Sequence, residues 1–166
     1  MIVIPNSISD SLASQCISEI DGSFHSSVWR SSSLIWNDDL KIGLTGSCLI
    51  SDPSLQVSEK IESEIKKYVP SYRVMKSLYY VWQSNSGISN HNDYGYLFGA
   101  TIYLNTHWDI NWGGIFIWNK SNEDHWRAIV PRFKSLVLND SKEDHLVTSI
   151  SPLSETPRVT IQIWAK

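Results

Sequence analysis

The chain places His91-Asn-Asp93 shortly before Phe98-Gly-Ala-Thr-Ile-Tyr-Leu-Asn105, a segment with the alternation of a β-strand. On an extended backbone, side chains two residues apart project to the same side. The imidazole of His91 and the carboxylate of Asp93 can therefore bind one ion. Two ligands alone do not hold a catalytic metal, so the rest of the chain must supply a third.

The third ligand has four candidates, of which His145 is the one we expect. It follows the acidic turn Lys142-Glu-Asp144 and opens a predicted strand, which would fix the direction of its side chain. Two histidines and one carboxylate form the facial triad of non-haem Fe(II) sites, but zinc accepts the same ligands. The residues themselves leave the choice of metal open. The other candidates are His25, His107 and His125, each in a predicted loop or connection.

A possible anion-binding residue, Arg158, opens the last predicted strand, 158–165. Alternation places it on the face opposite the apolar residues of that strand. A guanidinium on an inner face is costly unless it meets an anion, and its fork matches a carboxylate. Tyr103 could donate its hydroxyl to the same anion, and Thr160 lies on the same face as Arg158. A surface ion pair with Glu155 is the alternative for Arg158.

The order of the predicted elements indicates a mainly β fold with flanking α-helices. Apolar residues at helical spacing predict one helix over 8–20 and a second after Asp52-Pro53, ending at Pro70. We expect 21–37 to be a loop with a short strand, and Trp29 and Trp36 to cover the core. Further strands are predicted over 42–50, 74–83, around His91, and over 97–105, 114–118, 126–130, 135–139, 145–150 and 158–165. Short strands at this spacing predict a jelly roll with helices packed on one sheet, in one domain, 1–166, comprising supporting elements 1–73 and a catalytic core 74–166.

Composition excludes several classes of function. With 14 basic and 17 acidic residues, a net charge of −3 and no long basic run, we expect neither nucleic acid nor a membrane as a partner. The two cysteines, Cys16 and Cys48, are not paired at zinc-site spacing, so buried reduced thiols are expected. The start, Met1-Ile-Val-Ile-Pro-Asn6, has neither a basic leader nor a long apolar segment, which favours a cytoplasmic location.

Taken together, the motifs from His91 onward resemble the 2-oxoglutarate- and Fe(II)-dependent oxygenases, and within them the prolyl-hydroxylase branch. They occur in the order of that family and nearly at its spacing, which is more specific than any single motif. The first half of the chain resembles the family only as helices before a roll. The matching pieces are His91-Asn-Asp93, Ile102-Tyr-Leu-Asn105 with Trp108-Asp109, Gly113-Gly-Ile115, Ile129-Val-Pro131-Arg-Phe133, His145-Leu-Val147 and Arg158-Val-Thr-Ile-Gln-Ile-Trp164.

The resemblance implies an iron-dependent dioxygenase with 2-oxoglutarate and O2 as cosubstrates and with ascorbate as a helpful reductant. It implies that His91, Asp93 and His145 bind Fe(II) and that Arg158 and Tyr103 hold the distal carboxylate of 2-oxoglutarate. It further implies a double-stranded β-helix, and oxidative decarboxylation to succinate coupled to C–H hydroxylation. Trp164 matches an aromatic residue that flanks the metal in this branch.

The sequence departs from the family before His91, where a tyrosine often lies near the cosubstrate. Either Tyr80 or Trp82 can fill that place. The connection between His145 and Arg158 is also longer than in the animal oxygen-sensing enzymes. Three functions therefore remain open: a prolyl-hydroxylase-like enzyme acting on a peptide, a hydroxylase of a free amino acid or other small metabolite, and a non-catalytic jelly-roll binding module.

Overall fold

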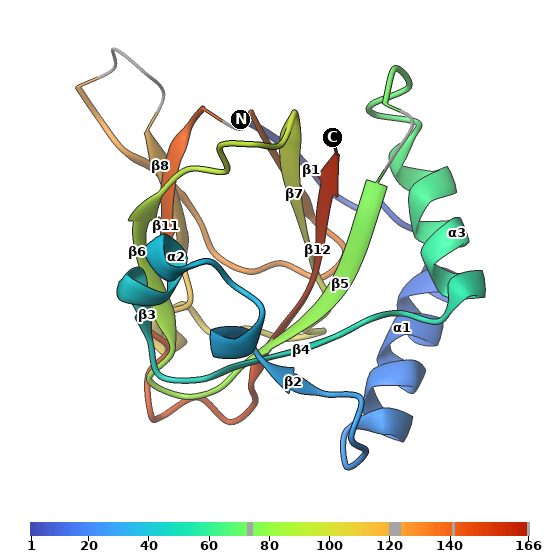
Figure 1. The fold of residues 1–166 in the computed structure, drawn as a ribbon, viewed down its shortest axis with the longest axis horizontal. Helices are drawn as coiled ribbons and strands as arrows, with labels where there is room; N and C mark the ends of the chain where they lie inside the picture. The colour runs from blue at the N-terminus through green and yellow to red at the C-terminus, as the bar shows by residue number, and fades with distance from the viewer. Residues whose placement is uncertain (73–74, 120–123, 141, 166) are drawn as a thin grey trace.

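The computed structural model describes residues 1–72, 75–119, 124–140 and 142–165. The described chain is mainly β, which confirms the predicted fold class: two antiparallel sheets face each other, and two helices cover the outer face of the larger sheet (Figure 1). The larger sheet has the order β1-β10-β7-β12-β5-β4-β2, and the smaller one β3-β6-β11-β8-β9.

The helices are α1 (Asp10–Ser23), α2 (Asp38–Gly43) and α3 (Leu55–Ile65), with the 3-10 turns η1 (Ser32–Leu34) and η2 (Ile110–Trp112). The strands are β1 (Ile2–Ile4), β2 (Arg30–Ser31), β3 (Leu44–Thr45), β4 (Cys48–Ser51), β5 (Met75–Trp82), β6 (Gly87–His91), β7 (Phe98–Tyr103), β8 (Phe116–Asn119), β9 (Arg127–Ile129), β10 (Leu136–Asp140), β11 (Asp144–Val147) and β12 (Arg158–Ala165).

The two faces of the central strand β12 have different roles, as the alternation of its sequence predicts. Ile161 and Ile163 are fully buried and pack in the core beneath α1 and α3. Arg158, Thr160 and Gln162 take the opposite face, which turns toward the smaller sheet. The helix side therefore provides the apolar core, while the space between the sheets receives the polar side chains.

Both long helices are amphipathic and begin at a serine cap. Ser9 caps α1 and Ser54 caps α3, each by accepting a hydrogen bond from a main-chain N–H of the first turn. Their buried residues all contribute to the core under the larger sheet, and Glu62 pairs with Lys66 at 2.7 Å on the outer face of α3, as expected. The members of this core from the helices are Leu12, Ala13, Cys16, Ile20, Val57, Ile61 and Ile65.

The structure corrects several predicted boundaries in the first half. The apolar run 42–50 is not one strand, because α2 ends at Gly43 and two short strands follow in different sheets. Asn37 caps α2 with its side chain, a signal that the strand prediction overlooked. The second long helix begins after Ser54 rather than at Asp52-Pro53 and ends at Ile65, before Pro70. The N-terminal strand β1, which pairs with β10, was not predicted either.

The predicted covering role of the two early tryptophans is confirmed, as is the state of the cysteines. Trp29 packs against the helix-side core and Trp36 against the core between the sheets. Cys16 and Cys48 are buried free thiols.

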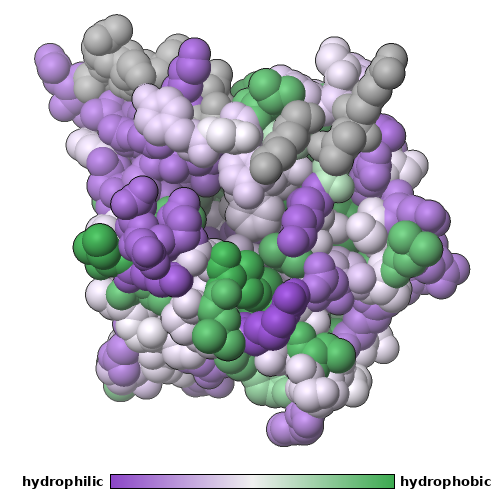
Figure 2. All heavy atoms as spheres, viewed as in Figure 1, coloured by the Kyte–Doolittle hydropathy of each residue, from purple (hydrophilic) through white to green (hydrophobic). Residues whose placement is uncertain are grey.

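The surface seen in the view of Figure 1 carries both hydrophilic and hydrophobic side chains. Hydrophilic side chains gather over the smaller sheet and α2, while apolar ones form small separate groups (Figure 2). Among the described residues, no helix is long and apolar enough to cross a membrane.

The buried face of β12 provides a test of the fold. Ile161 is 0% exposed, so truncating it to alanine leaves a cavity, and we expect Ile161→Ala to lower the free energy of unfolding by about 2–5 kcal/mol. Leu153→Ala is the control: Leu153 is 81% exposed, and its truncation should change stability by less than about 0.5 kcal/mol. Equilibrium denaturation in urea measures both. Equal effects of the two substitutions would contradict the assignment of Ile161 to the core.

Candidate metal centre and its cavity

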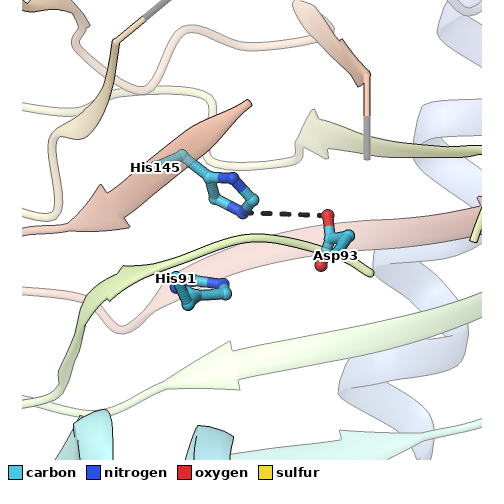
Figure 3. A group of neighbouring side chains, drawn as sticks. All are labelled: His91, Asp93 and His145. Atoms are coloured by element: carbon cyan, nitrogen blue, oxygen red, sulfur yellow. Dashed lines mark ion pairs between the residues drawn. The ribbon is translucent and has the colours of Figure 1, made fainter. Parts of the chain in front are cut away.

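Three potential metal ligands converge between the sheets. His91 ends β6, Asp93 follows it, and His145 lies on β11 directly opposite His91 in the antiparallel pairing. One ligand atom of each side chain lies within 4.8 Å of the others, and His145 Nε2 is 3.7 Å from Asp93 Oδ2 (Figure 3). The arrangement has the donor set of a facial triad, two imidazoles and one carboxylate.

Both histidine rings are oriented by the main chain. The Nδ1 of His91 lies 2.8 Å from the carbonyl oxygen of Ser89, and that of His145 lies 2.9 Å from the carbonyl oxygen of Glu143. A carbonyl can only accept, so Nδ1 carries the proton in each neutral ring and Nε2 is left to bind a metal. Burial, and then the neighbouring His145 ring, lower the pKa of His91, which favours the neutral form that a metal requires.

The carboxylate of Asp93 is held by two features that the sequence did not single out. Asn139 on β10 donates from Nδ2 to Asp93 Oδ2 at 3.0 Å. Gly99 on β7 leaves the space for this contact, since a Cβ there would lie 2.5 Å from the same Oδ2. Asn139 and Gly99 face each other in the β10–β7 register, so they could be recognised only once strand pairing was known.

The remaining histidines lie away from this group. His25 packs edge-on against Phe24, and His107 packs edge-on against Trp112; both are exposed. His125 is also exposed. Among the described residues, the cluster of His91, Asp93 and His145 is the one that could hold an ion through three such side chains.

The three ligands line a cavity of about 720 Å³ between the sheets. Its wall includes a series of aromatic rings, in which Tyr80 lies 5.9 Å from Trp36 and 5.8 Å from Trp164, and Trp164 lies 5.9 Å from Tyr96, measured between ring centroids. Trp82 also lines the cavity. Both candidates for the missing family tyrosine therefore reach the site, and the cavity combines aromatic walls with a polar side that carries the three ligands.

Arg158 is fully buried behind Trp82, which lines the cavity; its guanidinium carbon lies 5.8 Å from the ring centroid of Trp82 and 5.1 Å from that of Tyr103, and neither Arg158 nor Tyr103 lines the cavity itself. Within the described residues, no guanidinium nitrogen has a hydrogen-bond partner, and neither has the Tyr103 hydroxyl. The alternative of a surface ion pair with Glu155 is therefore wrong. Burial lowers the pKa of Arg158, with the Tyr103 side chain acting against that shift.

Thr160 belongs to a row of hydrogen-bonded polar side chains on the inner face of the larger sheet, together with Gln162 and Thr101. Its Oγ1 accepts from Gln162 Nε2 at 3.3 Å, and Gln162 Oε1 accepts from Thr101 Oγ1 at 2.9 Å. Gln162 and Thr101 line the cavity, whereas Thr160 does not. The structure thus places Thr160 beside Arg158 as part of a polar row rather than in the cavity wall.

The buried, unpartnered donors of Arg158 and Tyr103 fit a carboxylate, which is acceptor-only and can take the paired N–H groups of a guanidinium. The His-Asp-His set fits a divalent transition metal. Both fits rest on the donor chemistry of the residues present.

Comparisons with known proteins agree with this chemistry. The family model described as "2OG-Fe(II) oxygenase superfamily" matches residues 73–166. No curated protein sequence matches the chain.

Solved structures share the fold at low sequence identity. A prolyl hydroxylase from Trichoplax adhaerens, in complex with a peptide fragment of the hypoxia-inducible-factor oxygen degradation domain, has a TM-score of 0.78 and 18% identity, with 99% of this chain and 82% of that chain covered. A prolyl-4-hydroxylase from Pseudomonas putida has a TM-score of 0.74 and 13% identity, with coverage of 99% and 91%. The viral collagen prolyl hydroxylase of Paramecium bursaria Chlorella virus-1, in complex with 2-oxoglutarate, has a TM-score of 0.66 and 12% identity, with coverage of 99% and 94%.

Gly99 provides a test of how Asp93 is positioned. A methyl group at this position would meet Asp93 Oδ2 and the side chain of Asn139, so we expect Gly99→Ala to weaken Mn(II) binding about 10- to 100-fold. Isothermal titration of the metal-free protein with Mn(II) measures the affinity. Gly22→Ala is the control, since nothing lies within 4 Å of a Cβ there. Unchanged Mn(II) affinity in a folded Gly99→Ala variant would contradict the role given to this glycine.

Proposed function

The chain belongs to the 2OG-Fe(II) oxygenase superfamily, and from this we propose that His91, Asp93 and His145 bind its Fe(II) while Arg158 and Tyr103 bind the distal carboxylate of 2-oxoglutarate. The observation that carries the proposal is the convergence of the three ligand side chains within 4.8 Å at the wall of one cavity. A chance group of exposed acidic and imidazole side chains would not have both histidines oriented by carbonyls and the carboxylate held by Asn139. We propose further that residues 1–166 act as one domain in which 1–73 support the roll formed by 74–166.

The chemistry that iron, 2-oxoglutarate and O2 supply together is the hydroxylation of a C–H bond, with 2-oxoglutarate converted to succinate and carbon dioxide. The role of the residues of this chain is to bind and orient the iron and 2-oxoglutarate. The two histidines and Asp93 would hold the ion, and such a set of three ligands leaves coordination positions available for cosubstrates. Arg158 fixes the end of 2-oxoglutarate that does not react, Thr160 holds the polar row beside it, and an external reductant such as ascorbate would keep the iron in its ferrous state.

For the substrate, we favour a proline residue in a peptide. Three of the structures that share this fold are prolyl hydroxylases, and one of them contains a peptide. The aromatic wall formed by Trp36, Tyr80, Tyr96 and Trp164 offers flat apolar faces against which a saturated ring can pack. Trp164, which lines the cavity together with the three ligands, is the ring that we assign to the substrate beside the metal.

A small-molecule substrate is the second candidate. Two other structures with this fold are the epimerase SnoN of nogalamycin biosynthesis and Streptomyces hygroscopicus HygX with hygromycin B bound, at TM-scores of 0.67 and 0.68. The second of these structures holds a non-peptide ligand, hygromycin B. A substrate panel must therefore include both classes.

Turnover is the direct test of the function. We expect the purified protein to form succinate from 2-oxoglutarate only when Fe(II) is present, and faster with a proline-containing peptide than with free proline. Asp93→Ala should reduce the rate at least about 100-fold because it removes a ligand, whereas the surface control Asp52→Ala should retain the wild-type rate. Chromatographic quantification of succinate measures the rate with and without Fe(II), with each substrate, and for each variant. Succinate formation that is independent of Fe(II), or unaffected by loss of Asp93, would contradict the proposal.

Removing the buried guanidinium should affect binding and stability in opposite directions. Arg158→Met removes a charge that has no partner within the described chain, so we expect the cosubstrate-free protein to gain about 1–3 kcal/mol of unfolding free energy. The same substitution should abolish measurable 2-oxoglutarate binding by the Mn(II)-loaded protein. Arg30→Met, at an exposed ion pair with Asp52, is the matched control and should change neither quantity appreciably. A non-catalytic binding module would keep its ligand in the Arg158→Met variant, and that result would contradict the enzyme assignment.

A further inference from the structure

Unpartnered buried donors gather at one place in the molecule. Among the described residues, seven buried side-chain polar atoms have no hydrogen-bond partner, and five of them belong to just three neighbouring side chains. Such atoms are rare in folded proteins, and each one buried without a partner costs free energy. The five are Nε, Nη1 and Nη2 of Arg158, the hydroxyl oxygen of Tyr103 and Nε1 of Trp82.

Strand register brings the three side chains together. Trp82 on β5 lies directly opposite Arg158 on β12, and Tyr103 on the other neighbouring strand, β7, lies opposite Thr160. All three project to the inner face, and the Arg158 guanidinium lies near both rings. Trp82 is 3% exposed, and its Nε1 is shielded from bulk solvent.

Trp82 and Tyr80, the two candidates for the place of the family tyrosine near the cosubstrate, differ in their hydrogen bonds. The Tyr80 hydroxyl already accepts a hydrogen bond from Trp36 Nε1 at 2.9 Å, so it belongs to the aromatic wall of the cavity. Trp82 lines the same cavity, but no described residue is a hydrogen-bond partner for its indole N–H. Tyr80 keeps its own O–H as a donor, but Trp82 is the residue that lies opposite Arg158 and carries a buried donor without a partner among the described residues.

The donors define the class of ligand. An indole N–H and a guanidinium can only donate, so the acceptor must come from the bound molecule. An ionised carboxylate accepts about four hydrogen bonds and donates none, whereas an amide would present N–H groups to these donors. The cluster therefore favours a carboxylate over an amide at the buried end of the ligand.

We propose that the Trp82 indole N–H is a third donor to the distal carboxylate of 2-oxoglutarate, beside Arg158 and Tyr103. The inference rests on the proposed function, which supplies 2-oxoglutarate as the ligand. This assigns to Trp82, rather than Tyr80, the place where a tyrosine often lies in the family, and a donor-only N–H there would make this end of the site selective for an ionised acid.

The test removes the N–H and keeps an aromatic ring. We expect Trp82→Phe to weaken 2-oxoglutarate binding by the Mn(II)-loaded protein at least about tenfold, as befits the loss of one hydrogen bond to a charged group. Isothermal titration measures the affinity, and Mn(II) affinity itself should remain that of the wild type. Trp29→Phe is the matched control, because its indole N–H bonds Ser23 Oγ at 3.2 Å outside the cavity. It should leave 2-oxoglutarate affinity unchanged.

The outcomes separate the two proposals. Wild-type binding of 2-oxoglutarate together with unchanged affinity in Trp82→Phe would overturn this inference alone. A wild-type protein that binds no 2-oxoglutarate would overturn the proposed function, and the inference with it.

A second measurement covers the case in which Trp82→Phe does not fold. In the wild-type protein labelled with 15N-tryptophan and loaded with Zn(II), 2-oxoglutarate should slow the exchange of one indole N–H with water and move its resonance downfield. If no indole N–H responds in this way, the inference is overturned.

Discussion

The antiparallel pairing of β6 with β11 is the interaction on which the site depends. It sets His91 opposite His145 although 53 residues separate them in the chain, and the centroids of the two rings lie 4.3 Å apart. Because side chains alternate along a strand, a shift of one residue in this register would turn one imidazole away from the other. Asp93 then needs only to lie just beyond the strand end. The triad is thus a property of sheet register more than of loop conformation.

The larger sheet buries a charged side chain, Arg158, on its inner face. Its outer face packs against α1 and α3 and forms the larger apolar core, while its inner face carries the polar row and Arg158. An unpaired guanidinium is unfavourable in a folded protein, and the apolar core on the other side of the same strands offsets that cost. Separating the two roles by face lets one strand, β12, contribute to both stability and binding.

The second half of the fold was predictable because its signals are local. Alternation along β12 predicted that Arg158 and Thr160 lie on the face opposite its apolar residues, and the spacing of short strands indicated the roll. The first half was harder, since the boundary between α2 and β3 depends on the Asn37 cap and on tertiary pairing with β6. Asn139 and Gly99 were missed for a related reason: their role arises from contact with Asp93 across strands, and no pattern within a single segment reveals it.

The orientation of the two histidines has a consequence for how the sequence can vary. Each ring is fixed by the main-chain carbonyl two residues before it, those of Ser89 and Glu143, rather than by another side chain. Every amino acid provides that carbonyl, so substitutions at 89 and 143 leave the supporting contacts in place as long as the strands persist. The orientation of the two histidines therefore does not depend on which side chains lie at 89 and 143. Proteins that are only 12–18% identical to this chain can share its fold without sharing those two residues.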